Sequence, residues 1–140
     1  MKTRVAIVGA GPSGLLLGHL LTQAGIACVV VERQSRDYVL GRIRAGVLET
    51  VTTDLMHQLG IDARMNAEGL IEEGFNLATD DRLIRIDITA LTGRHVMVYG
   101  QTEVTRDLME AAPDRGLEIL FEAKDVALHD LESDAPSLTC

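Results

Sequence analysis

The sequence predicts an α/β domain built on a parallel sheet, and three observations near the N-terminus support this. A mostly apolar run over residues 4–8 leads into an apolar helical pattern over 13–24, which Gly25 is placed to end. A second apolar run over 27–32 ends in an acidic residue. Two strands joined through a helix by short turns are typical of a βαβ unit, in which the strands are parallel.

The turn between the first predicted strand and the first helix carries a glycine pattern. Gly9, Gly11 and Gly14 form Gly-x-Gly-x-x-Gly, and Glu32 follows 18 residues after the last glycine. Gly9 permits the tight turn, Gly11 leaves room for a pyrophosphate, and Gly14 lets the helix pack closely on the strand. Ser13 adds a hydroxyl at a helix N-terminus that favours phosphate. Because Glu32 can also accept ribose hydroxyls, the spacing predicts a Rossmann-like dinucleotide-binding unit; the alternative is a tight turn in another α/β protein.

Length and composition restrict the class of protein. The chain has 140 residues, of which 46% are hydrophobic and 24% charged, as expected for one soluble domain. Its net charge of −8 argues against a nucleic-acid partner or an anionic membrane surface. Two cysteines do not make a disulfide framework, and no signal peptide or membrane span is apparent, so we expect a cytoplasmic protein. None of the four histidines has metal-ligand spacing, so we predict no metal site, and no catalytic residue set is recognisable.

After residue 33 the pattern departs from regular alternation of strands and helices. Apolar residues at four-residue spacing predict a helix that Gly60 closes, and turn residues separate several short strands. The predicted elements are helices over 46–59 and 103–112 and strands over 75–78, 83–88, 95–99, 117–121 and 125–129. We interpret the three strands before the second of these helices as an inserted antiparallel ribbon. The last residues, 137–140, resemble the start of another strand, so we expect the chain to be truncated.

Several segments together resemble a known family, the class A flavoprotein aromatic hydroxylases, and within it the enzymes that act on 4-hydroxybenzoate. The resemblance covers essentially the whole chain and is weakest at 50–95 and after 110. The glycine motif is shared by many flavoproteins, whereas two of the runs are much more specific. The segments are Gly9–Gly14, Glu32–Gln34, Tyr38–Glu49 and Val98–Leu108, and the specific runs are Arg42–Glu49 and Tyr99–Val104.

The resemblance implies a fold, cofactors and partners. It implies bound FAD, with NADPH as co-substrate, O2 and an aromatic acid as the other reactants, and a homodimer at full length. Residues 1–71 and 99–140 would form the FAD-binding domain, and 72–98 a β insertion that belongs to a substrate domain. Because later segments of the family that complete both nucleotide sites are absent, we expect the 140-residue chain alone to be inactive.

The resemblance also implies which residues bind the cofactors, none of them catalytic. The implied cofactor-binding residues are Gly9, Gly11, Ser13, Gly14, Glu32, Arg33, Gln34, Tyr38, Arg42, Ile43, Arg44, Ala45, Gly46, Val47 and Gln101. Those from Gly9 to Glu32 would hold the ADP half of FAD. The segment Arg42–Val47 would line the flavin, with Arg44 near the pyrophosphate or ribityl chain, and Gln101 would contact FAD. Arg33, Gln34, Tyr38 and Arg42 would handle NADPH.

Plainer interpretations of the polar residues remain open. Arg33 and Arg36 fit solvated loop positions, Arg42 and Arg44 fit surface charges, and Gln101 fits an ordinary turn. The alternatives for the whole chain are a related FAD-dependent hydroxylase of another aromatic acid, one that prefers NADH, or a non-catalytic nucleotide-binding fragment. The residues that would contact an aromatic ring are not recognisable here, so the sequence leaves the substrate undecided.

Overall fold

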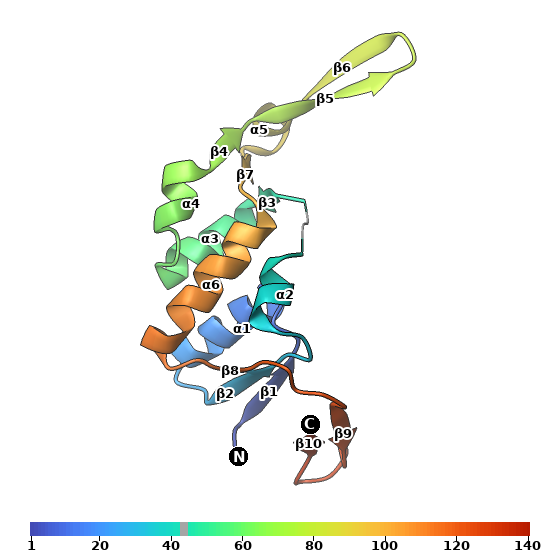
Figure 1. Cartoon of the computed structure of the whole chain (residues 1–140). Helices are drawn as coiled ribbons and strands as arrows, with labels where there is room; N and C mark the ends of the chain where they lie inside the picture. The colour runs from blue at the N-terminus through green and yellow to red at the C-terminus, as the bar shows by residue number, and fades with distance from the viewer. Residues whose placement is uncertain (43–44) are drawn as a thin grey trace. The chain divides into compact units, whose positions relative to one another are not determined.

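The computed structural model describes residues 1–42 and 45–140, which divide into two compact units. One unit contains Met1–Ile43 and Thr105–Cys140, and the other contains Arg44–Val104. Each unit is described by itself below, with the element labels of Figure 1. The division at residues 71 and 98 that the sequence suggests stays a prediction.

The first unit contains a three-stranded parallel sheet in the order β1-β2-β8. Strand β2 lies in the centre, where Val29, Val30 and Val31 are at most 4% exposed. Strands buried in this way read as continuous apolar runs in a sequence, which explains the run before Glu32. The elements of this unit, with the end of helix α6, are β1 (Val5–Val8), α1 (Pro12–Gln23), β2 (Cys28–Val31), α2 (Arg36–Leu40), β8 (Glu118–Leu120), β9 (Ala127–His129) and β10 (Ser137–Thr139).

Helix α1 packs unusually close to the sheet. A Cβ built on Gly18 would lie 3.0 Å from both methyl groups of Leu117 and 3.2 Å from a methyl of Val30. The helix ends before Gly25, whose φ of +72° is in the left-handed region that favours glycine. The predicted βαβ unit is therefore confirmed, together with the glycine that stops its helix.

The second unit contains two antiparallel sheets. Strand β7 is the centre of one, with the order β3-β7-β4, and β5 pairs with β6 in the other. The turn of the β5–β6 ribbon is Asp80-Asp81, which lies between the predicted strands over 75–78 and 83–88, since Thr79 pairs with Arg82. The elements are β3 (Val47–Glu49), α3 (Thr50–Leu59), α4 (Ala63–Glu68), β4 (Leu70–Glu72), β5 (Gly74–Thr79), β6 (Arg82–Asp87), α5 (Ile88–Thr92), β7 (Val96–Val98) and α6 (Gln101–Arg115), which continues into the first unit.

Four expectations about secondary structure were wrong in detail. The predicted helix over 46–59 begins only at Thr50, because Val47–Glu49 pairs with β7 and buries Leu48. The third predicted strand of the ribbon, β7, belongs to the other sheet. Part of the supposed loop after β2 forms α2, and helix α6 runs past Pro113 to Arg115. In each case pairing or packing overrode a local pattern that was ambiguous over a few residues.

Candidate dinucleotide-binding site

The turn between β1 and α1 has the backbone geometry that its glycines predict. Gly9 has a φ of +109°, in the region that favours glycine, and its N–H donates to Val31 O at 2.8 Å. A Cβ on Gly14 would collide with the carbonyl oxygen of Gly9 and come within 3.3 Å of Ile7 Cγ2. A Cβ on Gly11 would meet nothing within 4 Å. Gly9 is therefore required by its backbone angle and Gly14 by packing, whereas Gly11 faces open space.

The N-terminus of α1 is prepared for an anion. Gly11 is the N-cap residue and has no side chain to accept a hydrogen bond from the first turn, where Pro12 is the first residue. The first turn of α1 carries no acidic side chain and includes Ser13, which is exposed. Free N–H groups and the positive end of the helix dipole therefore point into the space in front of Gly11.

Glu32 lies directly after β2 and is held beside the same turn. Its Oε2 accepts the N–H of Ala10 at 2.9 Å, and its Oε1 accepts the N–H of Gln34 at 2.8 Å. The side chain is half-buried, and its own N–H donates to Leu120 O at 2.8 Å. Each carboxylate oxygen keeps a further lone pair, so Glu32 can brace the turn and still accept ribose hydroxyls.

The segment after Glu32 brings two of the predicted residues together. Ser35 caps α2 by accepting the N–H of Tyr38 at 3.2 Å. One turn later, Arg42 Nη1 donates to the Tyr38 hydroxyl at 2.9 Å, and its guanidinium carbon lies 5.7 Å from the centroid of the Tyr38 ring. Tyr38 is 47% exposed and Arg33 is exposed, so this segment presents a cation and an aromatic ring to solvent.

In the second unit, two segments far apart in sequence meet at a pair of glycines. A Cβ on Gly46 would lie 2.7 Å from Gly100 Cα and 3.0 Å from Tyr99 O, and the Tyr99 N–H donates to Gly46 O at 2.7 Å. This contact places 45–47 beside the start of α6, which Gln101 begins. Ala45 and Val47 are exposed and Gln101 is half-buried. The structure therefore joins the two specific runs of the sequence, while Ile43 and Arg44 lie outside the described residues.

Sequence reasoning missed three backbone contributions to these sites. The N–H of Ala10 fixes Glu32, the carbonyl of Val31 fixes Gly9, and Gly100 allows the approach of Gly46. Backbone donors and acceptors belong to every residue type, so no sequence signal distinguishes Ala10 or Val31. Both glycines of the Gly46–Gly100 pair are visible in the sequence, but their contact is not.

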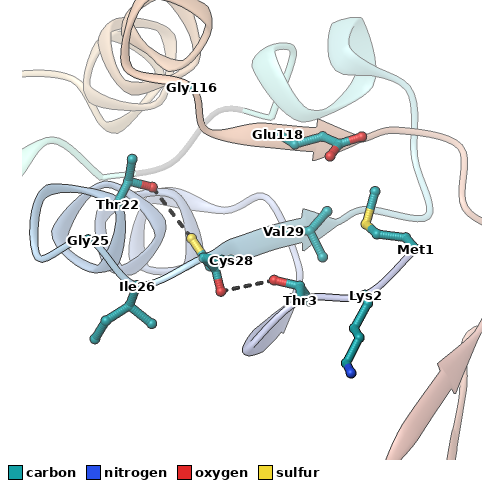
Figure 2. A pocket seen from close by; sticks show the side chains of 11 residues that line it. Met1, Lys2, Thr3, Thr22, Gly25, Ile26, Cys28, Val29, Gly116 and Glu118 are labelled. Carbon is teal, nitrogen blue, oxygen red and sulfur yellow. Dashed lines mark hydrogen bonds between the residues drawn. The ribbon is translucent and has the colours of Figure 1, made fainter.

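A hollow lies at the opposite end of β1 and β2 from the glycine turn. It has a volume of about 360 Å³ and is lined by residues that precede β1 and by the start of β2. Figure 2 shows Cys28 between Thr22 and Thr3: its Sγ lies 3.5 Å from Thr22 Oγ1, and Thr3 Oγ1 donates to the neighbouring Ala27 O at 2.9 Å. Since dinucleotides bind at the carboxyl ends of the strands in open α/β sheets, this hollow is not the candidate cofactor site.

Two further features are absent from the part of the chain that the structure describes. Residues 1–42 and 45–140 hold no helix long and apolar enough to cross a membrane. Within the same ranges, no three His, Cys, Asp or Glu side chains gather where they could hold a metal ion.

Comparison with known proteins agrees with a dinucleotide-binding α/β domain. Residues 2–139 match the FAD binding domain family, and the chain belongs to this family. It is 51% identical to p-hydroxybenzoate hydroxylase of Acinetobacter baylyi (strain ATCC 33305 / BD413 / ADP1) over 140 residues, which is 99% of this chain and 34% of that protein. It is 28% identical to pentachlorophenol 4-monooxygenase of Sphingobium chlorophenolicum over 86% of this chain and 24% of that protein. The chain thus spans about a third or less of these relatives.

Solved structures share the fold. PqsL of Pseudomonas aeruginosa, in complex with 2-aminobenzoylacetate, aligns with a TM-score of 0.81 at 21% identity and covers 97% of this chain and 38% of that chain. CabE, an aromatic hydroxylase from angucycline biosynthesis, aligns with a TM-score of 0.71 at 28% identity and covers 99% of this chain and 29% of that chain. The Rossmann-like α/β fold class predicted from the sequence is therefore confirmed, and so is the resemblance to flavin-dependent hydroxylases.

Proposed function

We propose that this chain is the FAD-binding part of a flavin-dependent monooxygenase that converts 4-hydroxybenzoate to 3,4-dihydroxybenzoate. In the balanced reaction, NADPH supplies two electrons, one oxygen atom of O2 enters the ring, and the other leaves as water. The observation that carries the proposal is the 51% identity to p-hydroxybenzoate hydroxylase across 99% of the chain. The reaction belongs to the full-length protein, because the chain covers 34% of that relative.

The residues of the glycine turn fit the ADP half of FAD. The open space in front of Gly11 and the N–H groups of α1 suit a pyrophosphate, and the free lone pairs of Glu32 suit the adenosine ribose. In the other unit, Ala45, Gly46, Val47 and Gln101 would contact the remainder of FAD, together with Ile43 and Arg44. Bound FAD supplies the redox chemistry with O2, while these residues bind and orient it.

NADPH would be handled by the exposed segment after Glu32. Arg33 and Arg42 would provide the positive charge for its phosphates, with Gln34 and Tyr38 as polar neighbours. The guanidinium of Arg42 is already ordered by its bond to Tyr38, which reduces the entropy lost when a phosphate binds. We further propose that the enzyme acts in the cytoplasm as a homodimer.

The FAD site is tested most sharply by replacing Gly11 with Asp in the full-length protein. The new side chain would enter open space, and Asp is a favourable N-cap residue, so the variant should fold with unchanged or slightly higher stability. Its carboxylate would repel the pyrophosphate, so we expect at least a hundredfold weaker FAD binding, roughly 3 kcal/mol. The measurement is a titration of apoprotein with FAD, followed by flavin fluorescence.

The matched control is Gly14→Ala, which should lower stability because its Cβ would collide with the carbonyl of Gly9. A Gly11→Asp variant that folds and binds FAD like the wild type would contradict the FAD site.

Substrate identity needs a separate assay with NADPH, O2 and a panel of aromatic acids. Hydroxylation of a different acid, with none of 4-hydroxybenzoate, would favour a related hydroxylase, and FAD binding without any turnover would favour a non-catalytic nucleotide-binding protein.

A further inference from the structure

His19 is a buried titratable residue in the middle of α1, the helix whose N-terminus forms the candidate cofactor site. Its side chain is 1% exposed, and its Nε2 lies 2.8 Å from the carbonyl oxygen of Leu108 in α6. A carbonyl oxygen only accepts hydrogen bonds, so Nε2 must carry the hydrogen. The contact therefore ties α1 to the part of α6 that belongs to the same unit.

The other ring nitrogen, Nδ1, is buried and accepts no hydrogen bond from any of the described residues. In the neutral ring Nδ1 is a bare acceptor, which costs modestly to bury. In the protonated ring Nδ1 would be a charged donor with no acceptor in reach, which is far more costly in a packed interior.

The groups around the ring also oppose a positive charge. Burial lowers the pKa of His19 below its ordinary value of 6.5, the bond to Leu108 acts in the opposite direction, and the Arg115 charge on α6 lowers it further. Of the described charged groups, the one that acts on the ring is the Arg115 cation, which has the same sign as an imidazolium and cannot compensate it.

We propose that His19 is a proton-sensitive latch between α1 and α6. The neutral ring fits between the two helices, whereas protonation would place an unpaired charged donor, Nδ1–H, in the packed interior, so that acid weakens the packing of α1 on α6 and, through α1, the binding of the dinucleotide. The part concerning the dinucleotide rests on the proposed FAD site. The part concerning the two helices does not.

The sign of the pH effect follows from proton counting. Below about pH 6.5 the unfolded chain binds a proton at His19 that the folded chain does not. Stability from this residue is therefore complete above that pH and is lost as the pH falls toward the lowered folded-state pKa. One proton of difference changes the unfolding equilibrium constant by at most about tenfold per pH unit.

The test is His19→Gln in the full-length apoprotein, unfolded with urea at pH 7.5 and at pH 5.5. The Gln amide can still donate to Leu108 O but does not titrate. From pH 7.5 to 5.5 the wild type should lose up to about tenfold more in its folding equilibrium constant than His19→Gln. The control is His129→Gln, which removes an exposed histidine in β9 and should keep the acid sensitivity of the wild type. Parallel losses in wild type and His19→Gln would overturn the latch.

Two further measurements test the proposal independently. If His19→Gln does not fold, NMR titration of the wild-type protein measures the protonation state of the His19 ring directly. The variants His57→Gln and His129→Gln help to assign its signals. A ring protonated on both nitrogens in the folded protein at pH 6.5 would overturn it, and an Nε2–H tautomer that persists below pH 6 would support it. FAD release at pH 5.5 that is slower in His19→Gln than in wild type would support the dinucleotide part. Failure of the wild-type protein to bind FAD at pH 7.5 would refute the proposed function. The urea experiment would then decide by itself whether His19 links the two helices in a pH-dependent way.

Discussion

Strand β2 and the β5–β6 ribbon are both rich in apolar residues, yet they end up in opposite environments. Val29, Val30 and Val31 in β2 are at most 4% exposed, whereas Phe75 and Leu83 in the ribbon are 51% and 70% exposed. Strand β2 has a strand on each side and α1 against it, while the ribbon pairs only with itself. The difference teaches that apolar composition does not decide burial. What decides the burial of a strand is how many other strands and helices of the chain pack against it.

The register of the ribbon sharpens this contrast. Phe75 pairs with Ile86 and Leu77 with Ile84, and alternate pairs lie on the same face, so four apolar side chains share one face of the ribbon. Two-stranded ribbons are at best marginally stable alone in water. Phe75, Leu77 and Ile84 on this face are 51%, 48% and 44% exposed, so the contacts of this chain leave the face largely open to solvent.

The largest expected effect comes from the same substitution made on each side of the contrast. Leu15→Ala removes a side chain that is 0% exposed in α1 and should cost about 3 kcal/mol of unfolding free energy. Leu83→Ala removes one that is 70% exposed in β6 and should change stability by less than about 0.5 kcal/mol. Urea unfolding of both variants measures the difference. Equal losses would mean that the ribbon is covered in the full-length protein.

A smaller effect on stability is expected when a hydrogen-bonded acidic residue after β2 is compared with an exposed one in β8. Glu32→Gln keeps one oxygen and replaces the other with an NH2 group, so the N–H of either Ala10 or Gln34 loses its acceptor. The loss should be about 1–2 kcal/mol of stability, accompanied by weaker FAD binding. Glu118→Gln, at an exposed position of β8, is the control and should be nearly neutral in both assays. Wild-type stability in Glu32→Gln would show that these two bonds contribute little.

The smallest effect on stability is expected at the exposed basic segment. Arg42→Ser removes a solvent-facing cation–π contact and should change unfolding free energy by less than about 0.5 kcal/mol. If Arg42 binds a phosphate of NADPH, the ratio of kcat/KM for NADPH over NADH should fall roughly tenfold. Arg36→Ser makes the same charge change in α2 and should leave the ratio unaltered. An unchanged ratio in Arg42→Ser would remove this residue from the nucleotide site.

The sequence by itself determined the βαβ unit, the glycine turn and the acid that follows β2. These depend on local periodicity and on backbone angles that glycine permits, and both are written in neighbouring residues. Gly9 and Gly25 accordingly adopt the positive φ values that their positions suggested. The turn between the predicted strands over 75–78 and 83–88 was likewise indicated by local turn residues, and Asp80-Asp81 forms it.

Only the tertiary structure decided which distant segments meet. Val47–Glu49 became a strand because β7 lies beside it, and Gly46 reached Gly100 across more than fifty residues of chain. The bond between Glu32 and Ala10 and the bond between His19 and Leu108 likewise join groups whose pairing leaves no local pattern. Sheet pairing and burial depend on contacts between remote residues, so they override local propensity and become visible only once the chain is folded.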